Sequence, residues 1–462
     1  YYQPVTRTDI EKIRGVITNK SEQGYNTKGL IKKLESIEES YDELIKFGIS
    51  LSDIQINEDW PYIEPNNLDD IREESNKNRP IKLKKKIDYK QSKEKIKAAF
   101  LGSISGCILG KPLETSLTGK EIKEALIKIN EWPLCYYVPK KIKNALPRVH
   151  NSFHETIREN IEYVAPDDDI NYTIMGMLIL EKYGEQFTHK NISDMWLHHL
   201  PINTTFGPER TILLKSGLDS LSRFSRSQFS MKGGVGLKNS EEINYSSELN
   251  LINEVLNPGD ELCGAAIRAD AYGYACPGNP ELASKMAWVD SSFTHRRTGI
   301  YATMFLSAAI SCAQVLEDKM EIIETALEFV PQKSRFFERS IASYLDVKNS
   351  KNWEDGYAKI NNKLGEYGHC RIYQEIGMVI NTLKHARDIG DGICIQVSQG
   401  ADTDSFGASA GSLLGAFYGP KYLDDKWIKP FNDDIHTGLA WFFERSVNSL
   451  SRRMGNLPRK IR

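Results

Sequence analysis

The amino-acid sequence predicts an all-α fold with an added helical region at the N-terminus. Apolar residues recur at helical spacing in several segments, whereas convincing strands of alternating polar and apolar residues are scarce. Two series of glycines at intervals of four also indicate helices, because this spacing puts the glycines on one helix face. The expected helices cover residues 170–183, 298–316, 321–330, 373–387 and 406–418.

The glycine series predict that two helices lie against each other. The first series is Gly102, Gly106 and Gly110, and the second is Gly407, Gly411, Gly415 and Gly419. Each glycine costs a helix roughly 1 kcal/mol relative to alanine, so the repetition indicates that backbone approaches backbone. Lys95, Lys97 and Lys111 flank the first series, which favours the centre of a soluble core over a membrane pair.

Residues 1–90 are expected to form a helical N-terminal appendage with a connector, and residues 91–462 the main domain. An apolar seam at helical spacing predicts one helix, which Asn26 or Thr27 can cap and Gly48 can end. The seam consists of Leu30, Leu34, Ile37, Tyr41 and Leu44. An acidic stretch over residues 53–79 and a lysine-rich stretch over residues 81–97 follow. Because their charges cancel, we interpret them as a solvated connector rather than a nucleic-acid patch.

The overall composition argues against several classes of partner. With 60 basic and 62 acidic residues, the net charge of -2 provides no general attraction to nucleic acid or anionic membranes. No apolar run reaches the roughly 18 to 20 residues of a membrane span, and the first residues do not resemble a signal peptide. The seven cysteines are scattered without a C-x-x-C pair, which is typical of the cytoplasm and disfavours a structural zinc site.

Three consecutive aspartates, Asp167, Asp168 and Asp169, directly precede the helix expected over residues 170–183. One aspartate can cap a helix and another can complement its dipole, each contributing about 1 kcal/mol. Capping explains a third acid poorly, because adjacent anions repel each other. A hard divalent cation makes such a cluster favourable, so the turn is a candidate metal site.

A second acidic turn, with Asp402, Asp404 and Ser405, precedes the second glycine-faced helix. Side chains two positions apart in an extended turn point the same way, so both aspartates can face one ion. An EF-hand is excluded because Phe406 and Leu413 occupy the fifth and twelfth loop positions. A phosphatase of the Asp-x-Asp type is disfavoured, because residues 398–400 are too polar for the buried parallel strand that it requires.

Four segments of the chain together resemble the ADP-ribosylglycohydrolase family. They are Gly106-Cys107-Ile108-Leu109-Gly110-Lys111-Pro112-Leu113-Glu114, Asp167-Asp168-Asp169-Ile170, Gly264-Ala265-Ala266-Ile267-Arg268 and Gly400-Ala401-Asp402-Thr403-Asp404-Ser405. Their order and wide spacing also match the family. The resemblance implies a compact orthogonal helical bundle that extends from about residue 95 to at least Gly419. The N-terminal appendage lies outside this bundle.

The resemblance also implies a metal centre and an adjoining substrate site. Asp168, Asp169, Asp402, Asp404 and Ser405, joined by Asp167, would bind two divalent cations, usually magnesium, with manganese or calcium as alternatives. The residues implicated in catalysis are Glu114, Asp168 and Asp169. The residues implicated in binding ADP-ribose are Gly259, Asp260, Gly264, Arg268 and His295.

Three positions depart from the family pattern. Cys107 stands where relatives often carry aspartate, and we expect it to be buried and unreactive in the middle of a helix. Asp167 and Ile170 replace the two threonines of the first acidic turn. Asp167 adds an anion where the family has a hydroxyl, so tighter cation binding or tolerance of manganese or calcium is a hypothesis.

The family resemblance predicts a cytoplasmic glycosidase that hydrolyses the bond between ADP-ribose and an acceptor through water activated by the cations. The acceptor would be a protein side chain or a small molecule, linked as an N- or O-glycoside. A hydrolase of another ribosyl glycoside is one alternative. A non-catalytic ADP-ribose-binding homologue is another, although Glu114 argues against it.

Overall fold

The structure is a computed structural model that describes residues 5–37, 40–214 and 256–461. These residues form helices, turns and isolated β-bridges but no β-strand, which confirms the all-α prediction. The helices of the first half are α1 (Val5–Glu22), α2 (Leu30–Glu35), α3 (Tyr41–Ser50), α4 (Leu68–Glu74), α5 (Tyr89–Gly110), α6 (Gly119–Lys128), α7 (Phe153–Thr156), α8 (Asp168–Tyr183) and α9 (His189–His199).

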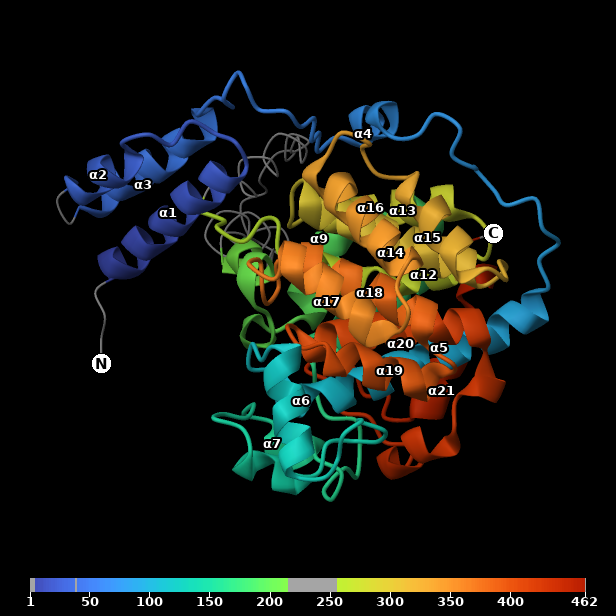
Figure 1. Cartoon of the computed structure of the whole chain (residues 1–462). Helices are drawn as coiled ribbons and strands as arrows, with labels where there is room; N and C mark the ends of the chain where they lie inside the picture. Colours follow the sequence, from blue (N-terminus) through green and yellow to red (C-terminus); the bar gives the residue numbers. More distant parts are fainter. Residues whose placement is uncertain (1–4, 38–39, 215–255, 462) are drawn as a thin grey trace, which may run out of the picture.

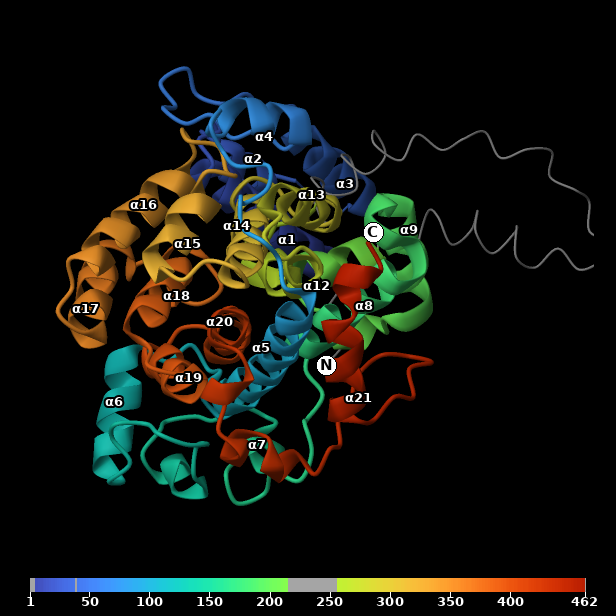
Figure 2. The same cartoon turned by 90° about the vertical axis from the view of Figure 1, so that its right-hand side faces the viewer.

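The helices of the second half complete the bundle. They are α12 (Asp270–Ala275), α13 (Pro280–Ser291), α14 (Thr298–Ala313), α15 (Lys319–Leu327), α16 (Arg335–Lys348), α17 (Trp353–Leu364), α18 (Tyr373–His385), α19 (Ile389–Ser398), α20 (Thr403–Tyr418) and α21 (Val447–Gly455). The five helices expected from periodicity are therefore present as α8, α14, α15, α18 and α20. Helices α5 and α20 run through the middle of the bundle, with the other helices packed around them (Figures 1 and 2).

The two glycine series meet along the contact between α5 and α20, as their spacing predicts. Gly102 lies against Gly411, and Gly106 lies against Gly407, so the two helices are antiparallel. A Cβ atom on Gly106 would lie 2.0 Å from the carbonyl oxygen of Gly407, and one on Gly411 would lie 2.1 Å from that of Gly102. Only residues without side chains allow the two backbones to come this close.

Among the described residues, one helical stretch, Tyr89–Leu113, has the length and mean hydropathy of a membrane span. In its most apolar window, 89% of the stretch is buried inside the protein. Its position as the central helix of the bundle accounts for its apolar character.

Gly106→Ala is expected to lower the free energy of unfolding by about 1–3 kcal/mol, because the added methyl group overpacks the glycine contact. Helix propensity alone predicts the opposite sign, a gain of roughly 1 kcal/mol. Urea denaturation of the variant and the wild type distinguishes the two effects. An unchanged or increased midpoint would show that the helices do not approach as closely as described.

The N-terminal helices α1, α2 and α3 form a lobe beside the bundle with an apolar core of its own (Figure 1). The core consists of Ile13, Val16, Ile17, Leu34, Leu44, Phe47 and Leu51. The single helix predicted along the apolar seam is wrong, since α2 ends at Glu35 and α3 begins at Tyr41 after Ser40. The break lets both short helices turn Leu34 and Leu44 into the same small core.

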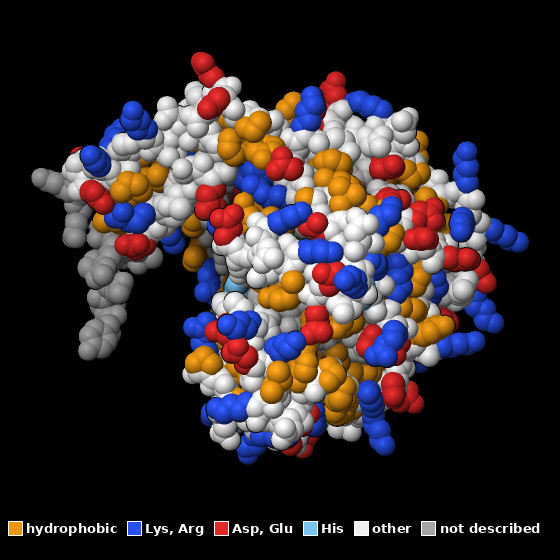
Figure 3. Space-filling view, viewed as in Figure 1, with side chains coloured by type: hydrophobic (Ala, Val, Ile, Leu, Met, Phe, Trp, Pro, Cys, Tyr) orange, Lys and Arg blue, Asp and Glu red, His pale blue; other side chains and the backbone are white. Residues whose placement is uncertain are grey.

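The connector between the lobe and α5 is attached to the bundle over much of its length, which corrects the expectation of a solvated segment. The side chain of Glu64 is buried and accepts hydrogen bonds from Arg335 of α16 at 2.9 and 3.0 Å. Leu83 donates a backbone hydrogen bond to Gly278 at 2.9 Å. The lysines at 84–86 are exposed, as predicted. On the face seen in Figure 3, basic and acidic side chains are interspersed.

Asp270 is a buried acid in the core that joins α12 to both central helices. Its Oδ2 atom accepts hydrogen bonds from Ser103 at 3.2 Å and Tyr274 at 3.3 Å, and the hydroxyl of Tyr274 lies 2.6 Å from that of Ser412. Burial outweighs these hydrogen bonds and raises the pKa of Asp270 to about 7. The carboxyl group therefore holds its proton more tightly in the folded chain than in the unfolded chain.

Asp270 is expected to make the protein more stable in acid than at neutral pH. Because the pKa of Asp270 is higher in the folded chain than in the unfolded chain, its protonation stabilises the fold at a pH below about 4. This stabilisation is lost as the pH rises from about 4 to about 7. The full loss corresponds to about 4 kcal/mol. Urea denaturation at a series of pH values measures it, and Asp270→Asn should remove this part of the slope. Equal slopes for both proteins would contradict the assignment.

Candidate functional site

A cavity of about 480 Å³ opens where α8 and α20 begin and α5 ends. Both acidic turns contribute to its wall, together with the segment that follows α5. The predicted site residues that line the cavity are Glu114, Asp167, Asp168, Gly264, Asp402 and Ser405. Asp169 and Asp404 are buried beside them. They lie close enough for the charge of Asp404 to help raise the pKa of Asp169, after burial and the charge of Asp167. The structure thus places the two acidic turns, which are far apart in sequence, around one space.

Asp167 shapes the first acidic turn by capping α8. Its backbone is extended, with φ of -151° and ψ of 148°, and its side chain accepts a hydrogen bond from the backbone N–H of Asp169 at 3.0 Å. The capping interpretation therefore holds for this aspartate. Because the helix begins at Asp168, the partial positive charge of the helix N-terminus lies next to the acids and stabilises their ionised form.

The second acidic turn is held against the end of α5 by its backbone. Gly400 and Ala401 have φ values of 83° and 63°, and the N–H of Ala401 donates to the carbonyl of Leu117 at 2.8 Å. A Cβ atom on Gly400 would lie 2.5 Å from the same carbonyl oxygen, so this position requires glycine. The hydroxyl of Thr403 donates to the carbonyl of Gly110 at 2.8 Å. These contacts fix Asp402 and Asp404 next to the C-terminal end of α5, which Glu114 follows by four residues.

Lys111, which the sequence interpretation treated only as a flanking charge, lies at the centre of the acids. Its ammonium nitrogen is 2.6 Å from Asp167 Oδ2, 2.7 Å from Asp404 Oδ2 and 2.7 Å from Glu114 Oε2. The side chain is only 10% exposed. A signal was available in the sequence, because a lysine that directly follows a helix expected at the centre of the core needs anionic partners inside the protein.

Lys111 divides the acids into ionised and protonated groups. Burial tends to raise the pKa of Asp404, but the charge and hydrogen bond of Lys111 hold it well below its ordinary value. Burial and the neighbouring Asp404 raise the pKa of Glu114 to about 10, against the pull of Lys111. Burial and Asp404 likewise raise the pKa of Asp402 to about 6. At neutral pH, Glu114 therefore carries a proton while Asp404 is an anion.

The acids fit a hard divalent cation. The Oδ1 atoms of Asp169, Asp402 and Asp404 are buried and have no hydrogen-bond partner among the described residues. A buried carboxylate oxygen without a partner is costly, and carboxylate oxygens are the ligands that magnesium, manganese and calcium prefer. Burial and the charge of Asp167 also raise the pKa of Asp168 and Asp169, so their repulsion exceeds what Lys111 neutralises. A further cation would relieve this repulsion.

Arg268 does not line the cavity, although it was predicted to bind substrate. Its guanidinium is buried and pairs with Glu209 and Asp290, and it donates to the hydroxyl of Thr294 at 2.8 Å. Glu209 does line the cavity, and a Cβ atom on Gly264 would lie 2.7 Å from its carboxylate. Arg268 therefore positions Glu209 beside Gly264. Sequence reasoning missed Glu209 because no local pattern connects it to Arg268.

The other predicted substrate residues lie behind the cavity wall. His295 is fully buried, with Nδ1 2.7 Å from the hydroxyl of Thr294, and burial holds its pKa well below the ordinary value. Asp260 is buried and accepts hydrogen bonds from Asn19 at 2.6 Å and Gln23 at 2.8 Å. Asn19 belongs to α1 and Gln23 directly follows it, so Asp260 attaches the N-terminal lobe to the bundle. Gly259 packs against Leu262 and Pro208, both of which line the cavity.

Three cysteines lie close to the acids. Cys107 is buried in α5, as expected, with its sulfur 3.9 Å from Asp169 Oδ2. Burial and then the charge of Asp167 raise the pKa of this thiol well above its ordinary value. Cys263 and Cys370, which were not predicted as site residues, line the cavity next to Asp402, as does His369.

Comparison with known proteins agrees with the resemblance seen in the four sequence segments. A family model described as ADP-ribosylglycohydrolase matches residues 88–453, which include α5, α8, α20 and every residue lining the cavity. A solved structure described as an ADP-ribosylglycohydrolase-related protein complex shares 17% sequence identity and has a TM-score of 0.43. That similarity covers 81% of this chain and 100% of the other. No curated protein matches the chain.

Proposed function

Because the chain belongs to the ADP-ribosylglycohydrolase family, we propose that it uses divalent cations to hydrolyse the glycosidic bond between ADP-ribose and an acceptor. Family membership supports the coarser statement that the chain is a glycohydrolase. The observation that carries the finer proposal is the group of buried carboxylate oxygens without partners beside a cavity of about 480 Å³. The acceptor would be a protein side chain or a small molecule, in the cytoplasm.

Two divalent cations would be held by Asp168, Asp169, Asp402 and Asp404, with Ser405 as a neutral ligand. Magnesium is the first choice, and manganese and calcium are alternatives that share its preference for oxygen ligands. When bound, such cations hold sugar hydroxyls and lower the pKa of a water molecule. Asp167 mainly forms an ion pair with Lys111 through Oδ2, and it caps α8 by accepting the N–H of Asp169 through Oδ1.

Hydrolysis places positive charge on the anomeric carbon as its bond to the acceptor breaks. The anionic carboxylates around the cavity stabilise that charge. A water oxygen forms the new bond to this carbon, and the acceptor atom that leaves must take up a proton. Glu114 lines the cavity, and burial raises the pKa of its carboxyl group, so we assign to it the donation of this proton. Asp404 and Lys111 fix its carboxyl group.

The phosphates of ADP-ribose need donors that the acidic wall does not supply. We assign this role to backbone N–H groups at helix N-termini, which favour anions. Gly264 keeps one wall of the cavity free of a side chain next to Glu209. Arg268 does not bind the phosphates, since its guanidinium is already engaged by Glu209, Asp290 and Thr294.

A panel of defined ADP-ribosyl linkages tests the proposal. Peptides modified on arginine or on serine and a small O-glycoside would be incubated with the protein and magnesium, and free ADP-ribose would be measured. We expect release from at least one linkage, loss of release with a chelator, and recovery with added magnesium. Release that is insensitive to the chelator would contradict the role of the cations. Binding of ADP-ribose without release from any linkage would indicate a binding protein.

A further inference from the structure

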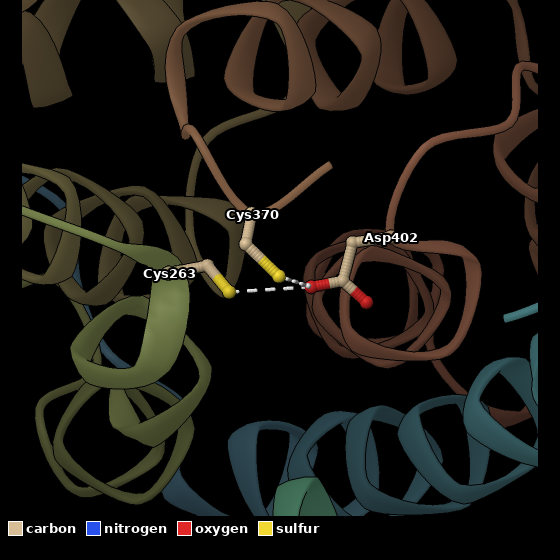
Figure 4. A group of neighbouring side chains, drawn as sticks. All are labelled: Cys263, Cys370 and Asp402. Atoms are coloured by element: carbon tan, nitrogen blue, oxygen red, sulfur yellow. Dashed lines mark hydrogen bonds between the residues drawn. The ribbon is translucent and has the colours of Figure 1, made fainter. Parts of the chain in front are cut away.

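Two thiols meet one oxygen of Asp402 at the edge of the cavity. The sulfur of Cys263 is 3.2 Å from Asp402 Oδ2, and the sulfur of Cys370 is 3.3 Å from the same atom (Figure 4). Cys263 begins the 3₁₀ turn Cys263–Arg268, whereas Cys370 precedes α18. The ligand atoms of all three residues lie within 4.8 Å of one another.

The backbone holds these three residues together. The N–H of Cys263 donates to the carbonyl of Cys370 at 3.1 Å. The buried carboxyl group of Glu375 accepts from the N–H of Cys370 at 2.8 Å and from the N–H of Asp402 at 3.3 Å. The side chains therefore converge because their main chains are fixed, and each needs little rearrangement to share a ligand.

We propose that Cys263, Cys370 and Asp402 form a binding site for a soft divalent cation of the zinc type, with a fourth position open to the cavity. Zinc binds thiolates at about 2.3 Å and carboxylate oxygens at about 2.0 Å, so a tetrahedral arrangement places sulfur and oxygen about 3.5 Å apart. The observed separations of 3.2 and 3.3 Å are already close to this value.

The second oxygen of Asp402 supports this assignment. Oδ1 points away from the two sulfurs, is buried and has no hydrogen-bond partner among the described side chains (Figure 4). The carboxylate of Asp402 can therefore bind a soft cation through Oδ2 and one of the proposed magnesium ions through Oδ1. His369 lies at the open side, where one ring nitrogen is within 4.8 Å of oxygens of Asp402 and Glu114.

The chemistry of the donors separates this site from the proposed magnesium site. Magnesium and calcium prefer oxygen ligands and gain little from sulfur, whereas thiolates select zinc and similar cations. Binding would release both thiol protons to solvent. The sequence argued against zinc because it lacks closely spaced cysteine pairs. That spacing rule does not apply to two cysteines brought together by separate segments of the fold.

Titration with cobalt(II), a spectroscopic substitute for zinc, tests the site. The full chain is reduced, freed of metal and supplied with excess magnesium to occupy the proposed carboxylate sites, and cobalt should then produce the near-ultraviolet absorption of a thiolate-to-cobalt transition that saturates at one equivalent. Zinc should displace the cobalt, and magnesium should not. The double variant Cys263→Ser/Cys370→Ser should lose the absorption. Cys135→Ser removes an exposed cysteine outside the cluster and should retain it.

Alkylation gives a second measurement that needs no variant. Zinc should protect Cys263 and Cys370 of the wild-type protein from iodoacetamide, as measured by peptide mass spectrometry. The proposal is overturned if the reduced protein shows no thiolate absorption, if the absorption survives in the double variant, or if zinc leaves alkylation unchanged. A disulfide between the two cysteines in protein purified under reducing conditions would also overturn it. None of these measurements involves ADP-ribose, so they are independent of the proposed hydrolysis.

Discussion

Asp404→Asn is expected to reduce the release of ADP-ribose by roughly 10³-fold, which is typical of losing one charged group from a catalytic centre. Asparagine has nearly the same shape as aspartate but carries no charge. The variant would lose the anion that holds Lys111 at 2.7 Å and the buried Oδ1 that is free to bind a cation. It would also remove the charge that, after burial, raises the pKa of Glu114.

The measurement is the rate of ADP-ribose release at saturating magnesium, together with magnesium affinity by isothermal titration calorimetry. Asp355→Asn is a matched control, because Asp355 also lies in the first turn of a helix but belongs to α17, outside the cavity. The control should keep the wild-type rate. Full activity of Asp404→Asn, with unchanged magnesium affinity, would remove Asp404 from the site.

Lys111→Met is expected to lower the free energy of unfolding of the cation-free protein by about 3–5 kcal/mol, the cost of leaving buried charges without their partner. Methionine fills similar space but supplies no positive charge to Asp167, Asp404 and Glu114. Millimolar magnesium should restore part of the loss, since a cation that binds only the folded chain stabilises it. Urea denaturation with and without magnesium measures both effects.

Lys95→Met provides the control for this experiment. Lys95 belongs to α5, which Lys111 directly follows, and is partly buried, but its ammonium group donates to the backbone carbonyls of Ala313 and Gln314 rather than to the acid cluster. Its loss should be smaller and should not respond to magnesium. If Lys111→Met were as stable as the wild type without any cation, Lys111 would not be the counter-charge of the cluster.

The sequence predicted those parts of the fold that depend on neighbours along one helix. The period of α8, α14 and α20 is local, and the glycine spacing identifies a helix face regardless of what covers it. The break between α2 and α3 was not predictable in this way, because the apolar period continues through it. It is set by how two short helices share a core with α1, which is a property of the packed lobe.

For the candidate site, sequence patterns indicated acids that share a turn but not groups that meet across the fold. Asp402 and Asp404 are separated by one residue and precede a helix, so their common direction could be inferred. Lys111 touches acids from three different segments, and no spacing rule describes that. The same limit explains why Arg268 was expected to face a ligand. Its partners Glu209 and Asp290 are adjacent to it only after folding.

The contact between α5 and α20 also has a consequence for biosynthesis. Helix α5 emerges from the ribosome well before α20, yet its glycine face acquires its partner only after residue 418 has been made. Contacts of such long range form late and leave apolar surface exposed in the meantime. A nascent chain that stops before α20 would lack Asp402 and Asp404 together with half of the central helix pair. Premature termination would therefore yield a substrate for chaperones and proteases rather than a weakened enzyme.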